Sequence, residues 1–220
     1  MNLTFTNRTG GVSLGAFASL NLGDHVGDDP SAVAANRRSL VDQFGPVQFM
    51  NQVHGDRIVI VEEVTDVIPE ADALVSGIPG IALAVMVADC IPLILTSKEV
   101  VAAVHVGRRG LVNDIARKTI RSMEEMGAGA ITAHIGPAIC GTCYEVSEEV
   151  FQEVVSRHPA TKSQTIKGTP ALDLIAGVRA VLSEEGLDIK SKFECTVESP
   201  VLFSYRRDGL TGRQAGIVSL

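Results

Sequence analysis

Three apolar runs in the middle of the chain constrain its fold more than any other feature. They cover residues 81–88, 92–96 and 100–106. A sheet with one wet face would alternate apolar and polar residues, so runs this apolar indicate strands that are buried on both faces. The gaps between the runs are too short for the helices that connect parallel strands. The sequence therefore predicts buried strands in antiparallel or mixed pairing.

Helices and further strands are predicted on both sides of this region. N-cap residues and apolar residues at helical spacing predict helices over residues 30–44, 111–126, 147–157 and 172–185. Short β-branched runs predict strands over residues 47–53, 57–63, 130–135, 192–196 and 215–218. With 220 residues, 45% of them apolar, and no composition shift that marks a linker, the chain can bury one core. We predict a single α+β domain over residues 1–220, with a mixed β-sheet layered with helices.

Composition narrows the class of partner. The formal net charge of −7 argues against a nucleic-acid-binding surface, which would be basic, and favours a small-molecule substrate. The N-terminus lacks a signal-peptide pattern, and no apolar run is long enough to cross a bilayer. We therefore expect a cytoplasmic protein without a membrane partner, whose four cysteines stay reduced. The oligomeric state stays open.

His54, Cys90 and His105 each stand where an apolar or β-branched run breaks. Two imidazoles and a thiolate are the protein ligands of an open zinc site, whose fourth position is left for water or substrate. Taken singly, a cysteine at a strand end is more often a small buried hydrophobe. The shared position at strand ends, where sites collect on rigid scaffolds, favours the metal interpretation.

Several segments match one known family. They are residues 10–13, 19–29, 36–37, 51–55, 71–73, 88–92, 105–110, 136–139, 143–146, 204–209 and 211–213. Together they resemble the YfiH-like family, also called laccase-domain or multicopper polyphenol oxidase proteins and described as purine nucleoside phosphorylases. The segments run in order from near the first residue to near the last, so the resemblance covers the whole chain.

The resemblance implies a metal and an activity. It implies a zinc held by His54, Cys90 and His105, and phosphorolysis of adenosine, inosine and methylthioadenosine with an adenosine deaminase side activity. The older family name implies copper and a laccase-like polyphenol oxidase. Laccase chemistry needs further His-rich copper centres, and the chain has five histidines in all. Zinc is therefore the expected cofactor, and copper is disfavoured.

Phosphorolysis requires an anion site, and the guanidinium fork of arginine matches phosphate geometry. Candidates stand in Gly-rich segments, namely Arg109, Arg206, Arg207 and Arg213. Gln52 is a further substrate-binding candidate. For at least one of Arg206 and Arg207 we expect instead a surface salt bridge with a neighbour such as Asp208.

The catalytic candidates are Asp89, Arg109 and Glu145. A carboxylate near the sugar would stabilise an oxocarbenium-like state, and it would also serve as the proton carrier for deamination. Asp89 is a candidate because it is adjacent to Cys90, and Glu145 because it stands in a matching segment. Arg109 would contribute a charged donor to the transition state.

Two positions depart from the family pattern. Arg108 stands where the family usually has Trp, so a cation replaces an aromatic wall and the preferred purine stays open. Cys140 and Cys143 form a Cys-x-x-Cys spacing, which can bind metal or act as a redox pair. Because no second such pair exists, we expect both cysteines to be dispensable for metal binding.

Two other functions compete with the phosphorylase. Cys90 could act as a nucleophile activated by His105, with backbone N–H groups near Gly107 holding an oxyanion, as in cysteine-dependent hydrolases. The protein could also be a non-enzymatic module stabilised by zinc. Structural zinc sites usually close with four protein ligands, and this counts against the module.

Overall fold

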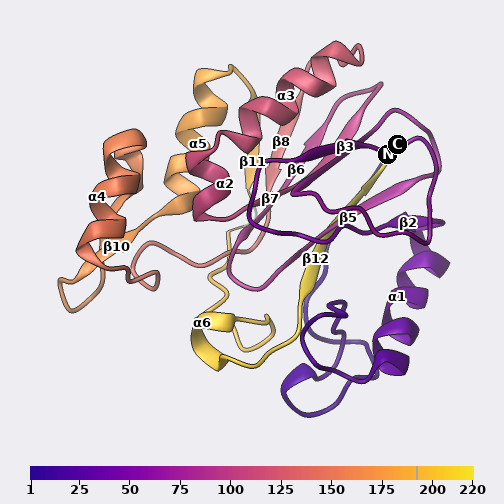
Figure 1. The fold of residues 1–220 in the computed structure, drawn as a ribbon, viewed down its shortest axis with the longest axis horizontal. Helices are drawn as coiled ribbons and strands as arrows, with labels where there is room; N and C mark the ends of the chain where they lie inside the picture. The colour runs from indigo at the N-terminus through magenta and orange to yellow at the C-terminus, as the bar shows by residue number, and fades with distance from the viewer. Residues whose placement is uncertain (192) are drawn as a thin grey trace.

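The computed structural model describes residues 1–191 and 193–220 (Figure 1). Its strands are β1 (Asn2–Phe5), β2 (Val47–Gln48), β3 (Ile58–Ile60), β4 (Ala73–Ser76), β5 (Ala82–Val87), β6 (Ile91–Thr96), β7 (Val101–Val106), β8 (Thr132–Ile135), β9 (Lys162–Gln164), β10 (Pro170–Leu172), β11 (Asp188–Ser191) and β12 (Gln214–Ser219). Its helices are α1 (Pro30–Phe44), α2 (Arg108–Val112), α3 (Ile115–Glu125), α4 (Glu148–Arg157), α5 (Leu174–Glu184) and the single turn α6 (Tyr205–Asp208), with 3-10 turns at Gly15–Phe17 and Pro159–Thr161.

The strands form two large sheets and one hairpin. One sheet has the order β1-β12-β5-β2, and the other has the order β11-β8-β6-β7-β4-β3. Both sheets are mixed, because β2 runs parallel to β5, and β3 and β11 run parallel to their neighbours β4 and β8. Strands β9 and β10 form the separate antiparallel hairpin. The fold is therefore α+β, as the sequence predicts.

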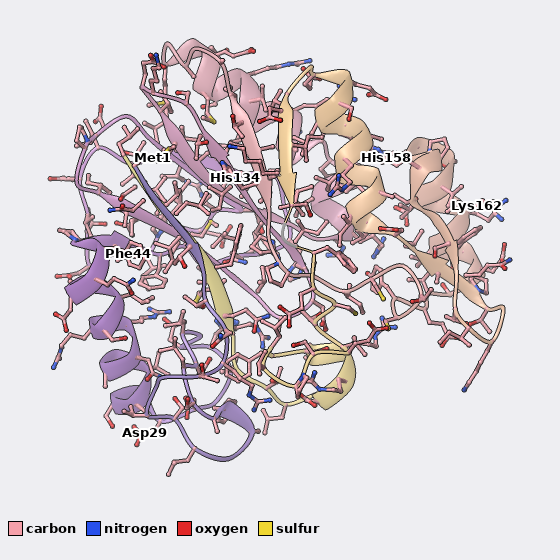
Figure 2. The ribbon with its side chains drawn as sticks, turned by 180° about the vertical axis from the view of Figure 1, so that it is seen from behind. Met1, Asp29, Phe44, His134, His158 and Lys162 are labelled. Carbon is pink, nitrogen blue, oxygen red and sulfur yellow. The ribbon has the colours of Figure 1, made fainter. Side chains whose placement is uncertain are left out.

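The two sheets stack face to face between layers of helices. Leu74, Leu83 and Val101 belong to the apolar cluster between the sheets. Helices α2, α3 and α5 cover the outer face of the larger sheet, and α1 covers the outer face of the smaller one (Figures 1 and 2). Each fully buried leucine contributes roughly 1.5–3 kcal/mol to such a core.

The central strands β6 and β7 confirm the prediction made from the apolar runs. They pair antiparallel, with Leu93 opposite Val104. Leu93 points into the cluster beneath the helices, whereas its neighbour Ile94 points into the cluster between the sheets. Because both faces of the strand are covered, apolar residues occupy consecutive positions. The first apolar run, β5, lies in the other sheet, so the connection from β5 to β6 passes from one sheet to the other.

Most predicted elements are present, and two are corrected. The helix predicted over 111–126 is two helices, because Asp114 has a left-handed backbone (φ 58°) and lies between the end of α2 at Val112 and the start of α3 at Ile115. The strand predicted over 192–196 is displaced: β11 ends at Ser191, and Cys195 only makes an isolated bridge with Ala138. Lys192 lies outside the described residues. Among the described helices, none is long and apolar enough to span a membrane.

Candidate active site

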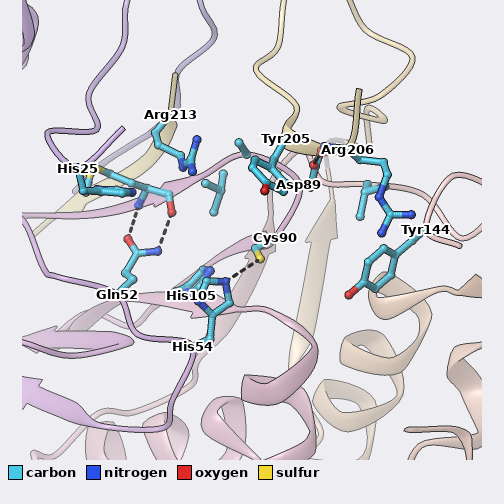
Figure 3. A pocket seen from close by; sticks show the side chains of 14 residues that line it. His25, Gln52, His54, Asp89, Cys90, His105, Tyr144, Tyr205, Arg206 and Arg213 are labelled. Atoms are coloured by element: carbon cyan, nitrogen blue, oxygen red, sulfur yellow. Dashed lines mark hydrogen bonds between the residues drawn. The ribbon is translucent and has the colours of Figure 1, made fainter. Parts of the chain in front are cut away.

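A cavity of about 400 Å³ opens where the end of β5, the start of β6 and the end of β7 meet. Figure 3 shows His54, Cys90 and His105 at its floor, with Arg213 and His25 on one side and Tyr144 and Arg206 on the other. Its volume lies within the usual range for small-molecule sites. The lining side chains are those of His25, Gln52, His54, Met86, Val87, Ala88, Asp89, Cys90, His105, Ile139, Tyr144, Tyr205, Arg206 and Arg213.

The fold brings together the three predicted metal ligands. One donor atom from each of His54, Cys90 and His105 lies within 4.8 Å of the others. The distance from the Cys90 Sγ to the His54 Nε2 is 3.8 Å. A tetrahedral zinc with ordinary Zn–S and Zn–N bonds would separate these two atoms by about 3.6 Å. The donor set and its spacing therefore fit zinc.

Asp72 positions two of these ligands from behind. Its carboxylate is fully buried, and its Oδ1 lies 2.7 Å from the Nδ1 of His105. The ionised carboxylate only accepts, so Nδ1 donates, and Nε2 is the atom that would bind a metal after losing its own proton. The same carboxylate accepts from the backbone N–H groups of His54 (3.0 Å) and Gly55 (2.6 Å). These bonds hold the loop in which His54 adopts a left-handed backbone (φ 59°).

Charge favours the ligand form of Cys90. Burial opposes ionisation of the thiol, but the neighbouring His105 and His54 outweigh burial and lower the pKa of Cys90 to about 6. Burial also disfavours the charged form of His105, yet Cys90 and Asp72 raise the pKa of His105 to about 9. The thiolate is the form that binds metal, so its stabilisation favours a metal site.

Gly107 permits the close approach of the ligands. A Cβ at this position would lie 3.1 Å from the Cys90 Sγ and 3.1 Å from the His54 Cδ2. These distances are shorter than ordinary van der Waals contacts. A side chain at the start of α2 would therefore require Cys90 or His54 to shift by a few tenths of an ångström.

Two of the four predicted phosphate-binding arginines line the cavity. The Arg213 Nη1 donates to the backbone carbonyls of Thr211 and Gly212, which holds the guanidinium in the cavity wall. The guanidinium of Arg206 lies 5.1 Å from the ring centre of Tyr144 and donates to the Glu145 carbonyl. The structure places Arg206 and Arg213 on either side of Tyr205 (Figure 3).

The other two arginines do not line the cavity. Arg109 is exposed on α2 and is not among the residues that line the cavity. The guanidinium of Arg207 pairs with Asp208 (2.7 Å) and donates to backbone carbonyls. This is the salt bridge that the sequence predicted for one of the pair. The carbonyls belong to Thr196, Val197, Ser199 and Leu202.

The predicted carboxylates differ in position. Asp89 lines the cavity, but its carboxylate accepts from the Thr196 and Ser204 hydroxyls (2.6 and 2.7 Å) and from the Arg206 backbone N–H (2.7 Å). These bonds anchor the start of α6. Glu145 is exposed and is not among the residues that line the cavity, because the neighbouring Tyr144 takes the inward direction.

Gln52 lines the cavity and links two segments of its wall. Its amide donates to the Met86 carbonyl (2.7 Å) and accepts from the Met86 N–H (2.8 Å), as Figure 3 shows. Both polar atoms of the side chain are thereby used to join the His54 loop to the end of β5.

Sequence reasoning missed four polar residues of this site. Asp72 lies in the matched segment 71–73, and His25, Tyr144 and Tyr205 lie in other matched segments. Their presence in those segments was the available signal. Burial raises the pKa of Tyr144, as does the nearby Cys90, whereas Arg108 and Arg206 oppose this. Arg108, which stands in the place of the family Trp, forms an ion pair with Glu153 (3.2 Å).

Comparison with known proteins places the chain in a family. The family described as multi-copper polyphenol oxidoreductase laccase matches residues 2–220. A purine nucleoside phosphorylase of Corynebacterium glutamicum is 47% identical, over 98% of this chain and 93% of its own length. One from Streptomyces griseus is 46% identical, over 100% of this chain and 94% of its own length.

Solved structures give the same result. A Neisseria meningitidis protein of the DUF152 family has a TM-score of 0.90 and 39% identity, over 98% of this chain and 92% of its own. YlmD from Geobacillus stearothermophilus has a TM-score of 0.88 and 32% identity, over 99% and 90%. The sequence match, the shared fold and the recognised segments agree: the chain belongs to the YfiH-like (DUF152) family, whose members carry the laccase-domain description.

Proposed function

We propose that this protein is a zinc-dependent purine nucleoside phosphorylase acting on adenosine, inosine and methylthioadenosine. Two observations support the proposal. Relatives 46–47% identical over nearly the whole chain bear the name purine nucleoside phosphorylase. The main structural support for the proposal is the arrangement of His54, Cys90 and His105. They line the same cavity as Arg206 and Arg213.

Different residues of the cavity would have different roles in phosphorolysis. Bound at the trio, zinc would supply a Lewis acid beside the substrate. Arg206 and Arg213 would bind phosphate and orient it toward the sugar, because guanidinium groups hold phosphate oxygens in fixed geometry. Tyr205, which is 62% exposed, offers an aromatic face to a purine.

Asp89 acts in this scheme as a positioning residue. Its carboxylate fixes the backbone of Arg206 and the Ser204 hydroxyl, and thereby the direction of α6. An adenosine deaminase side activity would require a proton carrier as well, and Asp89 is the predicted carboxylate that lines the cavity. Its three accepted hydrogen bonds would have to rearrange before it could carry a proton, so we propose phosphorolysis as the main activity.

The test is a panel of purine nucleosides incubated with and without inorganic phosphate, with free base measured by chromatography. We expect release of base only with phosphate, and ribose 1-phosphate as the co-product from adenosine and inosine. Equal release in phosphate-free buffer would show hydrolysis instead. Absence of release from every nucleoside would refute the proposal.

A cysteine-dependent hydrolase is the second candidate. The lowered pKa of Cys90 and the raised pKa of His105 favour it, because together they favour a thiolate beside an imidazolium. A metal-stripped protein that still turns over an amide or ester, and loses this activity on alkylation of Cys90, would support it.

Polyphenol oxidation has less support. Among the described residues, His134 and His158 lie outside the cavity, and both are labelled in Figure 2. The remaining three histidines are too few for the copper centres of a laccase.

A further inference from the structure

A second cluster of metal-binding side chains lies outside the cavity. One donor atom from each of Cys140, Cys143, Cys195 and Glu198 lies within 4.8 Å of the others. All four cysteines of the chain are free thiols. We propose that these four residues bind a second zinc ion, which has a structural role.

The donor set matches a closed zinc site. Zinc binds thiolates and carboxylates, and structural sites use four protein ligands in a tetrahedron. A sulfur and a carboxylate oxygen in such a tetrahedron are about 3.6 Å apart, given ordinary Zn–S and Zn–O bonds. The Cys143 Sγ already lies 3.7 Å from the Glu198 Oε1. The trio in the cavity has three ligands and an open side, whereas this cluster has four.

Local structure holds the two halves of the cluster in place. Cys140 and Cys143 lie on a tight turn, in which the Cys143 N–H donates to the Cys140 carbonyl (3.1 Å). Gly141 allows this turn to pack, because a Cβ there would lie 2.7 Å from the Ser163 Oγ. Cys195 and Glu198 lie on another turn, closed by the Ser199 N–H and the Cys195 carbonyl (3.0 Å).

Further hydrogen bonds join the halves to each other. The Thr196 N–H donates to the Ala138 carbonyl, and the Ala138 N–H donates to the Glu194 carbonyl (both 3.2 Å). The Cys140 N–H donates to the Cys195 Sγ (3.4 Å), and N–H donors of this kind orient the thiolate ligands of metals. These contacts therefore hold the four donor side chains close together.

The cluster supports the wall of the active-site cavity. Ile139, next to Cys140, donates its N–H to the Asp89 carbonyl (2.9 Å). Thr196, next to Cys195, donates its hydroxyl to the Asp89 carboxylate. A metal that ties Cys140 to Cys195 would therefore fix both segments that hold Asp89, the residue adjacent to Cys90. This revises the expectation that Cys140 and Cys143 are dispensable for metal binding.

The test is the zinc content of protein purified without oxygen, measured by elemental analysis. We expect two zinc ions per chain in the wild type, one in Cys143→Ser and one in Cys90→Ser. Glu149→Gln is the control, because Glu149 is an exposed carboxylate in the first turn of α4 and lies outside the cluster; it should keep both ions. A wild type with one zinc that Cys143→Ser retains would overturn the proposal.

A second measurement leaves the four residues of the cluster unchanged, so it does not depend on the folding of a variant that lacks one of them. Cobalt(II) bound to Cys90→Ser protein should show the intense thiolate-to-metal absorption of a tetrahedral site with several sulfur ligands. Absence of cobalt binding to Cys90→Ser would overturn the proposal. A disulfide among Cys140, Cys143 and Cys195 in the anaerobic wild type, found by peptide mapping together with a single zinc, would also overturn it.

Discussion

Replacing Asp72 by Asn removes one negative charge while keeping the shape of the side chain. The carboxylate accepts from His105, His54 and Gly55, and more weakly from the Val53 N–H at 3.4 Å. One amide oxygen can keep about half of these bonds. Each lost bond to a charged group costs about 1.5–3 kcal/mol, so the metal-free protein should lose roughly 3–6 kcal/mol of unfolding free energy.

The same change should weaken zinc binding. Outer partners of metal-binding histidines typically contribute 10–100-fold in affinity, or about 1.4–2.7 kcal/mol. Competition with a zinc chelator measures the affinity, and urea unfolding measures the stability. Asp56→Asn is the matched control, because Asp56 is an exposed carboxylate one residue after Gly55 and pairs with Lys118. An Asp72→Asn protein that binds zinc as tightly as the Asp56→Asn control would refute the role given to Asp72.

Four further substitutions test the phosphate site, the metal site and the core. Arg213→Ala and Arg206→Ala should each raise the KM for phosphate at least about tenfold, whereas the exposed Arg109→Ala should not, as steady-state kinetics with varied phosphate will show. Gly107→Ala should lower zinc content by displacing Cys90 and His54, whereas Gly129→Ala, whose Cβ would meet only Glu99 at 3.5 Å, should not. Leu93→Ala should lower the free energy of unfolding by about 2–5 kcal/mol in urea titrations, whereas Ile166→Ala, at a 94% exposed position, should have little effect.

The sequence predicted the elements whose signals are local. Side-chain caps at Ser147 and Asp173 begin α4 and α5 within the predicted ranges 147–157 and 172–185, since a capping side chain and its N–H partner are close in sequence. The break at Asp114 was missed, because apolar spacing continues across it. The pairing of β5 with β12 could not be predicted either, because 126 residues lie between Val87 and its partner Gln214 in the sequence.

The same distinction applies to the site. His54, Cys90 and His105 were identified by residue type and by position at strand ends, and the structure brings them together. Arg109 was chosen for its nearness to His105 in sequence, and helix geometry turns it toward solvent. The partners of Cys140 and Cys143 are contributed by a turn more than fifty residues later, which no sequence spacing indicates.

Phosphorus NMR of a reaction with inosine distinguishes phosphorolysis from hydrolysis by its products. If the cavity at His54, Cys90 and His105 catalyses phosphorolysis, inorganic phosphate will decrease and a sugar phosphate ester will appear in equal amount with free hypoxanthine. Cys90→Ala, which lacks the thiolate ligand, should give no ester. Free hypoxanthine with unchanged inorganic phosphate, or an unchanged rate in Cys90→Ala, would contradict the account.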